Sequence, residues 1–329
     1  MFRRATWTAR SSLGSHRNSE DAPRLLASLS AAYEALGRWR VTRVIGVLFL
    51  RSLARLWLER AVVEGEISRA DDITVVIGTR NRADYRLENA LRSIRSQTYP
   101  ADLLRVVVVD YGSDPDCAAR AAGLCRKYGA KYVRVDGVQI WSRSRCLNIG
   151  IRQADTKFLL SSDADIVFPP DYLASCVEML RAAPTSIVGS VMLDLPEHAA
   201  AVLEDSARTG DELQFDSWKQ WCRPRHDHAI HPSICATYTA FFQVIRGYDE
   251  FYEVWGNEDE DLYRRFRYLG LKPRQLGHGS FYMHQWHPES ARGRDGKNAD
   301  RVRRNQLYVA RARSLLRNDV NWGIPGSRG

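Results

Sequence analysis

From Ile73 onward, short apolar runs rich in β-branched residues alternate with stretches of helical periodicity, and this alternation constrains the fold more than any other feature. The runs occupy residues 73–78, 104–110, 132–135 and 157–161. Continuous apolar strands separated by helices are typical of a parallel sheet that is covered on both faces. The sequence therefore predicts an α/β fold with a Rossmann-like, mostly parallel central sheet.

Beyond residue 165 the pattern is less regular. We expect a helix over 170–182 and a strand over 187–193, followed by a long loop with a helical piece over 196–232. After this loop we expect a strand over 236–244, a helix ending near 270, and a strand over 281–284. Loops as long as the one predicted here usually carry function when they lie inside a domain.

The charge is concentrated at the two ends of the chain. Residues 1–70 contain 12 arginines and 6 acidic residues, and residues 291–329 contain 10 basic and 3 acidic residues. Because the whole chain has a formal charge of +9, residues 71–290 carry a net charge of −4. An acidic middle does not favour a nucleic-acid-binding domain and suits an active site that uses a metal ion.

These patterns divide the chain into four parts: a flexible basic N-terminus (1–22), a basic amphipathic helical extension (23–70), the α/β domain (71–290) and a basic, partly helical C-terminal tail (291–329). With 44% hydrophobic and 26% charged residues, the chain is typical of a folded protein.

The helical extension would either pack on the domain or contact an anionic membrane surface through residues 40–62. No apolar run reaches the roughly 20 residues of a membrane span, and we see no secretory signal. Six cysteines without regular spacing indicate reduced thiols. We therefore expect a cytoplasmic protein, at most peripheral to the inner face of the membrane.

Two acidic motifs stand out. Asp163 and Asp165 flank Ala164 directly after a buried strand, where ligands of parallel sheets bind. Two carboxylates at this spacing can hold a divalent cation, although the same spacing recurs at 114–116 and 259–261. Four consecutive acids then begin the helix that starts at Glu258, which is more than helix capping requires. Like charge in this block would raise the pKa of one acid and favour a general base.

Histidines provide further candidate ligands. His284 and His287 close the last predicted strand, so either could join the aspartates at a metal. His226, His228 and His231 have a spacing compatible with zinc, but they lack a cysteine and have only Asp227 as an acidic partner. A polar acceptor loop is the alternative interpretation of that second set.

Together these motifs resemble the family 2-type glycosyltransferases of the GT-A fold, over residues 73–287. Within that class the similarity is greatest to β-1,4-galactosyltransferases and to transferases of the bacterial chondroitin-polymerase type. The resemblance rests on segments in the family's order: 77–82 (IGTRNR), 109–113 (VDYGS), 141–150 (WSRSRCLNIG), 162–165 (SDAD), 247–250 (GYDE) and 255–261 (WGNEDED).

The resemblance implies a UDP-sugar donor and a Mn²⁺ or Mg²⁺ ion. Asp165 would hold the metal and its diphosphate, with His284, or alternatively His287, as a further ligand. Asp110 would bind the uracil, and the arginines would bind phosphate. The implied donor site comprises Thr79, Arg80, Arg82, Asp110, Trp141, Arg143, Asn148, Asp163, Ala164 and Asp165.

For catalysis, the resemblance implies an inverting transfer to an acceptor hydroxyl. Asp259 would be the general base, and Glu258 would orient the substrates. Trp255 and Gly256 would contact the acceptor, which would be a glycan or another compound with a hydroxyl group. An anionic acceptor would be compatible with the basic ends of the chain. Asn257 replaces a frequent glycine of the family close to the sugar pocket, so the resemblance does not determine which sugar is transferred.

A second hypothesis is a catalytically inactive GT-A scaffold that acts through its basic ends on membrane or nucleic acid. Tyr111, which stands where a second aspartate is common, departs from the family's pattern. The complete acidic block argues for an enzyme, since an inactive module does not need both acidic motifs.

Overall fold

Seven strands form the central sheet of this computed structural model, in the order β10-β6-β9-β4-β1-β2-β3. The structure describes residues 52, 55–56, 63–66, 69–225, 230–277, 280–288, 298–312 and 314–326. The strands of the central sheet are β1 (Ile73–Thr79), β2 (Leu104–Tyr111), β3 (Lys131–Val135), β4 (Phe158–Asp163), β6 (Ser186–Gly189), β9 (Cys235–Tyr238) and β10 (Lys272–Gln275). The sheet is parallel except at β9, which is antiparallel to both of its neighbours.

The parallel register aligns the ends of the central strands. Thr79 at the end of β1 lies opposite Asp110 of β2, and Gly78 lies opposite Asp163 of β4. Three polar segments that are far apart in the sequence therefore meet at one edge of the sheet, as the sequence predicted. The apolar interiors of these strands make the core: Val76 and Leu160, for example, are fully buried. Burial of each such side chain contributes about 1.5–3 kcal/mol.

A second, four-stranded sheet has the order β5-β11-β7-β8. Its strands are β5 (Ile166–Val167), β7 (Val191–Asp194), β8 (Arg223–Pro224) and β11 (Phe281–His284). His284 of β11 pairs with Ile166 of β5 on one side and with Asp194 of β7 on the other. This register places the end of β11 beside Asp165, the residue before β5.

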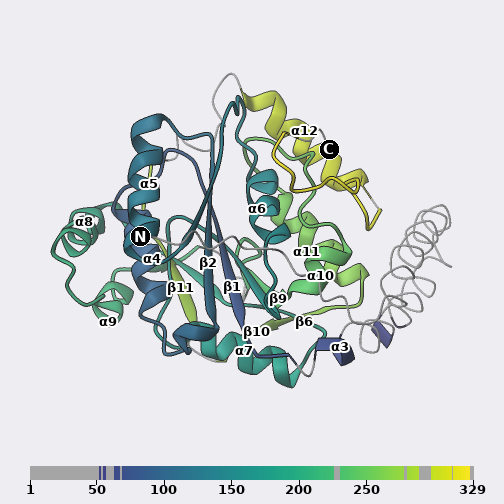
Figure 1. Ribbon diagram of the computed structural model, residues 1–329, viewed down its shortest axis with the longest axis horizontal. Helices are drawn as coiled ribbons and strands as arrows, with labels where there is room; N and C mark the ends of the chain where they lie inside the picture. Colours follow the sequence, from purple (N-terminus) through teal and green to yellow (C-terminus); the bar gives the residue numbers. More distant parts are fainter. Residues whose placement is uncertain are drawn as a thin grey trace, which may run out of the picture.

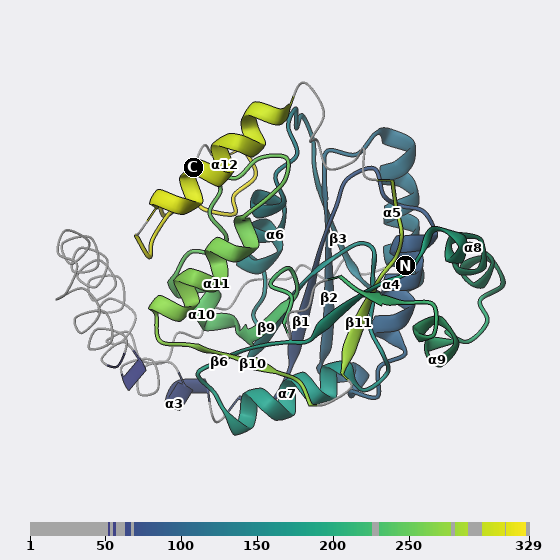
Figure 2. The same cartoon turned by 180° about the vertical axis from the view of Figure 1, so that it is seen from behind.

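Helices cover both faces of the central sheet, as expected (Figure 1). Seen from behind, β11 lies between the central sheet and the pair α8 and α9 (Figure 2). The helices are α3 (Glu64–Glu66), α4 (Tyr85–Arg95), η2 (Ala101–Leu103), α5 (Pro115–Lys127), α6 (Arg143–Arg152), α7 (Tyr172–Ala182), η3 (Glu197–Ala199), α8 (Ala200–Thr209), α9 (Phe215–Lys219), α10 (Thr239–Val244), α11 (Glu258–Tyr268) and α12 (Ala299–Arg311).

Local sequence explains where the helices beside the site begin. The Asp84 side chain accepts a hydrogen bond from the backbone N–H of Arg86 at the start of α4. The Ser142 hydroxyl does the same for Arg145 at the start of α6. Such N-caps satisfy backbone donors that the helix leaves free. Gly150 lets α6 lie against β1, because a Cβ there would come within 2.4 Å of Val76.

Two sequence predictions for the second half are corrected. The strand predicted over 187–193 is two strands in different sheets, β6 and β7, separated by Ser190. The strand predicted over 236–244 ends at Tyr238, and α10 follows. Phe241 and Phe242 of α10 are fully buried. A short apolar run fits a buried helical turn as well as a strand, so its periodicity cannot distinguish the two.

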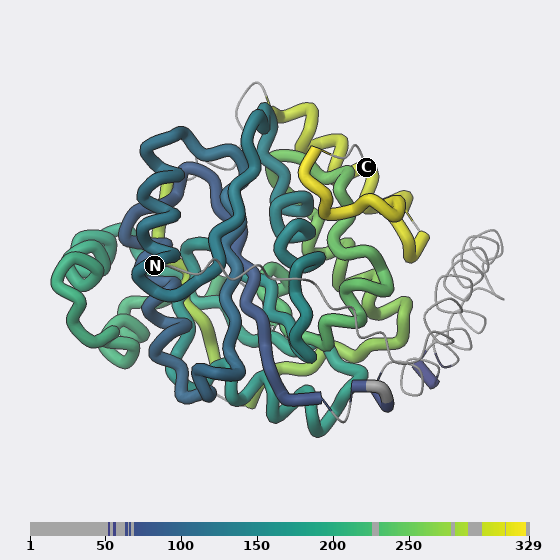
Figure 3. Tube along the Cα trace, viewed as in Figure 1, coloured from purple at the N-terminus to yellow at the C-terminus, as the bar shows by residue number. Residues whose placement is uncertain are grey.

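The C-terminal segment packs onto the domain. Leu315 is fully buried and Trp322 is only 7% exposed, and both belong to the main core. Arg152 of α6 donates to the carbonyl of Val320 at 3.1 Å, and the segment returns beside α6 (Figure 3). The residues predicted as a basic tail therefore contribute to the fold.

The predicted N-terminal parts, 1–22 and most of 23–70, lie outside the described residues. Within the described part of the chain, no helix combines the length and apolar character that a bilayer crossing requires. None of the six cysteines forms a disulfide, which agrees with the prediction of reduced thiols.

Candidate active site

Asp165 is the centre of one half of the site. Its side chain is almost fully buried, and its Oδ2 atom lies 3.6 Å from Nε2 of His284 and 3.5 Å from Nε2 of His287. One ligand atom from each of the three residues lies within 4.8 Å of the others. The sequence presented His284 and His287 as alternatives, and the structure brings both to Asp165.

A second carboxylate supports His284 from behind. Oδ1 of Asp194 lies 3.0 Å from Nδ1 of His284, on the side of the ring away from Asp165. Arg225 holds Asp194 through a 2.8 Å hydrogen bond from Nε, and its Nη2 lies 2.8 Å from the same Nδ1. Although burial opposes ionisation, hydrogen bonds from His284 and Arg225 hold the pKa of Asp194 well below its usual range. A carboxylate behind a histidine is the common way to orient a metal ligand.

The same surroundings fix the protonation of Asp165 and His287. Burial alone would raise the pKa of Asp165, but Arg82, whose guanidinium pairs with it, and the two histidines lower the pKa to about 2. Burial and then the charge of Arg82 lower the pKa of His287 to about 4. At neutral pH the cluster therefore offers an ionised carboxylate and a neutral imidazole at His287, the forms that bind metal ions.

This donor set fits a divalent cation. One carboxylate and two imidazoles converge on a single point, and a carboxylate supports one imidazole from behind. Imidazole is a softer ligand than the oxygens that Mg²⁺ and Ca²⁺ prefer, so the set suits a first-row transition metal better. Asp163, the other aspartate of the motif, pairs with Arg143.

Arg143 joins the two acidic motifs. Its Nε and Nη2 donate to the two carboxylate oxygens of Asp163 at 2.6 and 3.2 Å, and its Nη1 lies 3.8 Å from Glu258. Asp163 and Glu258 are 95 residues apart in the sequence. One guanidinium thus spans the end of β4 and the start of α11, and the two motifs face each other across it.

The four acids that begin α11 point in different directions. Glu258 is buried against Arg143, Asp259 is half-buried, and Glu260 is exposed. Asp261 is fully buried on the other side of the helix, where it accepts hydrogen bonds from Arg264 and Arg265. Only the first two therefore belong to the site, because each residue turns the side chain by about 100° around the helix.

The pKa values of Glu258 and Asp259 are both raised. Burial and the adjacent charge of Asp259 raise the pKa of Glu258 to about 7. Burial also raises the pKa of Asp259, with Arg143 opposing it and the charge of Asp163 adding to it. One Asp259 oxygen accepts the backbone N–H of Glu260 at 2.8 Å. Glu258 therefore exchanges its proton near neutral pH, and Asp259 binds a proton more readily than an ordinary aspartate, as acid–base catalysis requires.

The loop before α11 is held in a strained conformation. Val254 (φ 64°), Gly256 (φ 104°) and Asn257 (φ 74°) all have positive φ, which is rare for a β-branched residue. The backbone N–H of Val254 donates to the carbonyl of Trp141 at 2.8 Å. Trp255 is 38% exposed at the surface of this loop. Such strain persists only when neighbouring contacts fix it, and it is common at functional sites.

Asn305 of α12 supplies two of these contacts. Its amide nitrogen donates to the carbonyls of Glu253 (2.8 Å) and Trp255 (3.1 Å), and the residue is fully buried. Glu253 is also paired with Arg301 and Arg304 of the same helix. The helix predicted as part of a tail therefore holds the loop that leads into the acids of α11.

Two residues predicted to bind the donor are enclosed by the protein. Asp110 is fully buried and accepts hydrogen bonds from the backbone N–H of Ser113 (2.9 Å) and the hydroxyl of Tyr132 (2.6 Å). Asn148 is also fully buried and bonds to Tyr248 and Glu250. Their polar atoms have protein partners in this structure, and their contact with the nucleoside of the donor stays a prediction.

The prediction for Arg143 changes in part. We expected its guanidinium to bind phosphate, but two of its nitrogens hold Asp163. Its Nη1 is buried and has no hydrogen-bond partner among the described residues, so this one donor is left for a ligand.

The remaining predicted donor residues lie around the same sheet edge. Thr79 and Ala164 are each 2% exposed, so they offer backbone rather than side-chain surface. Arg80 is partly buried and donates to the carbonyl of Val138 at 3.2 Å. Trp141 makes an edge contact with Tyr111, with ring centroids 6.1 Å apart. Tyr111 is buried and Trp141 is half-buried, so Trp141 is the ring of this pair that offers surface beside the strand ends.

Some residues of the site were not predicted. Asp194 ends β7 directly after an apolar run, and that place was a usable signal. Arg225 and Asn305 carry no local signal, since their role depends on contacts with distant residues. Of the second histidine set, His226 and His228 lie outside the described residues, and His231 bonds to Ser233 at 2.8 Å.

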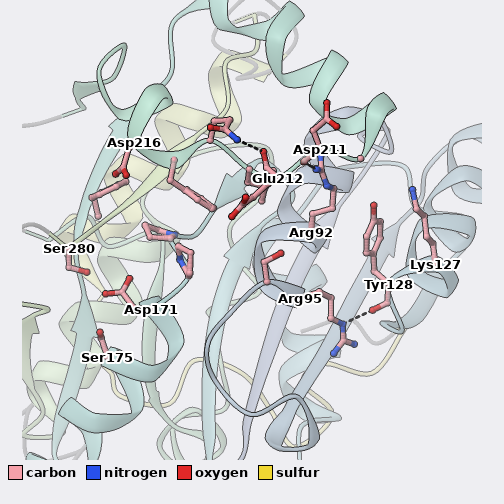
Figure 4. A pocket seen from close by; sticks show the side chains of 18 of the residues that line it. Arg92, Arg95, Lys127, Tyr128, Asp171, Ser175, Asp211, Glu212, Asp216 and Ser280 are labelled. Carbon is pink, nitrogen blue, oxygen red and sulfur yellow. Dashed lines mark hydrogen bonds between the residues drawn. The ribbon is translucent and has the colours of Figure 1, made fainter.

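A large cavity, of about 1150 Å³, lies away from these residues (Figure 4). It lies between the C-terminal ends of α4 and α5, the start of α7 and the segment 210–216. Its arginines already have partners: Arg95, for example, donates to the carbonyls of Tyr128 and Gly129. It contains none of the predicted site residues.

Comparison with known proteins gives matches over the same region. Residues 74–226 match the family model of glycosyl transferase family 2, and residues 218–288 match the model of the N-terminal domain of galactosyltransferase. No curated protein sequence matches this chain.

Among solved structures, S. aureus TarS 1–349 in complex with UDP-GlcNAc is similar, with a TM-score of 0.54 and 16% identity. The similarity covers 73% of this chain and 65% of the TarS chain. The same segment in complex with UDP has a TM-score of 0.48 and 18% identity, over 66% of this chain and 61% of TarS. The match therefore spans less than two thirds of TarS, and at this identity it shows the fold alone.

Proposed function

The chain carries a family 2 glycosyltransferase domain of the GT-A fold, and from this premise we propose that it transfers a sugar from a UDP-sugar to an acceptor hydroxyl. The reaction is metal-dependent and inverts the configuration of the anomeric carbon. The TarS structure that holds UDP-GlcNAc has the same fold, which supports a UDP-sugar as donor.

The observation that carries the proposal is the contact of Arg143 with both acidic motifs. A transferase must hold the acceptor oxygen within bond-forming distance of the donor's anomeric carbon, so the diphosphate site and the base must lie on opposite sides of one sugar-binding position. The cation-binding cluster around Asp165 and the proton-binding pair at 258–259 lie on either side of Asp163 and Arg143. A binding scaffold would not need this arrangement.

The donor diphosphate would bind at the carboxyl ends of β1 and β4. Asp165, His284 and His287 would hold the metal ion, and we favour Mn²⁺ over Mg²⁺ because two of the three ligands are imidazoles. The bound metal would neutralise the charge that develops on the departing UDP. Arg82 and Nη1 of Arg143 are the cationic donors nearest to that position.

Asp259 would be the general base. It would take the proton of the acceptor hydroxyl as that oxygen forms a bond to the anomeric carbon, while the bond from that carbon to the UDP oxygen breaks. Attack from the side opposite UDP inverts the carbon. The more buried Glu258, held near Arg143, would orient the substrates, and exposed Trp255 would provide an apolar surface for a sugar ring.

A panel of nucleotide sugars, incubated with Mn²⁺ or Mg²⁺, would test this function through donor hydrolysis. We expect UDP to be released from one or two UDP-sugars, more with Mn²⁺, and none from Asp165→Ala. Asp116→Ala is a matched control, because Asp116 ends another Asp-x-Asp motif, at 114–116, and is exposed. Absence of both hydrolysis and UDP binding with either metal would contradict the proposal.

A further inference from the structure

One exposed face of α12 is lined by cations. Asp300, Arg303, Arg304, Leu307 and Arg311 recur at intervals of three and four residues and therefore share this face. Together with Phe251 and Tyr308 they line a depression of about 370 Å³, which we term the α12 depression. The family resemblance of the sequence ends at residue 287, so nothing in it accounts for this surface.

Two of the three arginines of the α12 depression have no ion-pair partner in the part of the chain that the structure describes. They are Arg303 and Arg311, and both are exposed. Arg304 pairs with Glu253 and lies over the ring of Phe251 at 4.6 Å. Phe251 stacks on Tyr308, with ring centroids 3.9 Å apart. Two free guanidinium groups therefore border an aromatic surface.

The depression adjoins the catalytic loop. Asn305, on the opposite face of α12, bonds to the carbonyls of Glu253 and Trp255. Phe251 belongs to the same stretch of chain, seven residues before Glu258. Figure 1 shows α12 lying beside α11, whose first turn carries the proposed base. A polymer bound in the depression could extend to the acceptor position.

We propose that the α12 depression binds an anionic polysaccharide, as a subsite for the acceptor. This inference rests on the proposed function. Guanidinium groups form paired hydrogen bonds with carboxylate, sulfate or phosphate, and aromatic rings pack against the apolar faces of sugars.

An anionic membrane is the competing partner, and the depression suits it less. A membrane-binding helix presents a broad apolar face. On this face of α12, Leu307 is the only large aliphatic side chain, at 50% exposure, and the depression is concave. The chemistry therefore favours a polymer whose charged groups and rings alternate.

The test measures binding of the full-length protein to dextran sulfate, with unsubstituted dextran of equal length as the neutral probe. The variant is Arg303→Gln with Arg311→Gln. Its matched control is Arg120→Gln with Arg126→Gln, which removes two exposed arginines from α5. Because both variants lose the same charge, any contribution from the N-terminal arginines cancels in the comparison.

We expect the α12 variant to lose about tenfold in affinity for dextran sulfate, and its salt dependence to weaken by about one to two units of slope. The control should stay within about twofold of the unmodified chain, and dextran should not bind. Equal losses in the two variants would overturn the proposal. So would binding to vesicles containing phosphatidylglycerol that depends on Arg303 and Arg311 while dextran sulfate does not bind.

The closing measurement separates this proposal from the proposed function. UDP-sugar hydrolysis, measured on the same samples, should be unchanged in the α12 variant. If hydrolysis is absent from every sample but the two variants still differ in polyanion binding, the proposed function fails and the α12 depression stands as a polyanion site.

Discussion

Asp165 and the Glu258–Asp259 pair contribute carboxylates to one site, yet their surroundings move their pKa values in opposite directions. Asp165 is surrounded by Arg82 and two histidines, which hold its pKa near 2. Burial raises the pKa of both Glu258 and Asp259, and a like charge adds to it, that of Asp259 at Glu258 and that of Asp163 at Asp259. The comparison teaches that residue type alone does not set a carboxyl group's protonation: the neighbours favour the ionised form of Asp165 and the protonated form of Glu258.

The largest effects should separate the proposed roles of Asp165 and Asp259. Asp259→Asn removes the proton acceptor but keeps the shape, so kcat should fall by about 10²–10⁴-fold while UDP affinity stays within about twofold. Asp165→Ala should abolish transfer and also weaken UDP binding, because the diphosphate loses its cation. Calorimetric titration with UDP and Mn²⁺, alongside a transfer assay, measures both. Transfer that survives both substitutions would show that neither role is correctly assigned.

A smaller effect should come from the histidines that distinguish the Asp165 region. If both bind the metal, His284→Ala and His287→Ala should each lower Mn²⁺ affinity by about 10–100-fold. Asp194→Asn removes the carboxylate that supports His284, and it should lower Mn²⁺ affinity by a similar factor. Electron paramagnetic resonance of bound Mn²⁺ measures these affinities and does not require an active enzyme.

His198→Ala is the control, since His198 precedes α8 and contacts Trp221 rather than the site. Should His287→Ala bind Mn²⁺ as the unmodified chain does, His284 would be the only histidine ligand.

The dependence of activity on pH should test the role of the Glu258–Asp259 pair. Since Asp259 must be ionised to act and its pKa is raised, kcat/KM should rise with pH above the usual carboxylate range. Asp163→Asn removes the negative charge that adds to the raised pKa of Asp259, so the midpoint should move to lower pH by about half to one unit. Glu260→Gln, an exposed acid of the same turn as Asp259, should leave the midpoint in place.

The raised pKa of Glu258 should also make the stability of the folded protein depend on pH. The pKa of Glu258 in the folded protein, about 7, exceeds its usual value. Its contribution to the free energy of unfolding is therefore present at low pH and is lost as the pH rises through 7. Thermal unfolding of Glu258→Gln should lack that part of the pH dependence. A midpoint of activity that is the same in the unmodified chain and in Asp163→Asn would show that the charge of Asp163 does not act on Asp259.

The smallest effect concerns how each region is held. Strand register fixes the Asp165 region, whereas a strained loop and α12 fix the start of α11. Asn305→Ala should therefore lower kcat by about 3–10-fold with Mn²⁺ and UDP binding unchanged. Asn305→Gln should recover little, because its longer side chain does not fit a fully buried position. A loss confined to UDP binding would place Asn305 in the other region.

The sequence by itself determined the parallel sheet, the position of Asp163 and Asp165 at a strand end, and the acid block that begins α11. These features depend on periodicity, strand ends and helix starts, which are local properties of the chain. Because parallel strands end at a common edge, the local pattern also predicted that the polar ends would meet.

Only the tertiary structure decided which partners each side chain has. It brought both histidines to Asp165, enclosed Asp110 and Asn148, placed Arg143 between two carboxylates, and packed the predicted C-terminal tail against the catalytic loop. The partners come from segments of chain that lie up to 120 residues away, such as Asp165 and His284. Burial and pKa depend on these distant neighbours, so no local pattern could supply them.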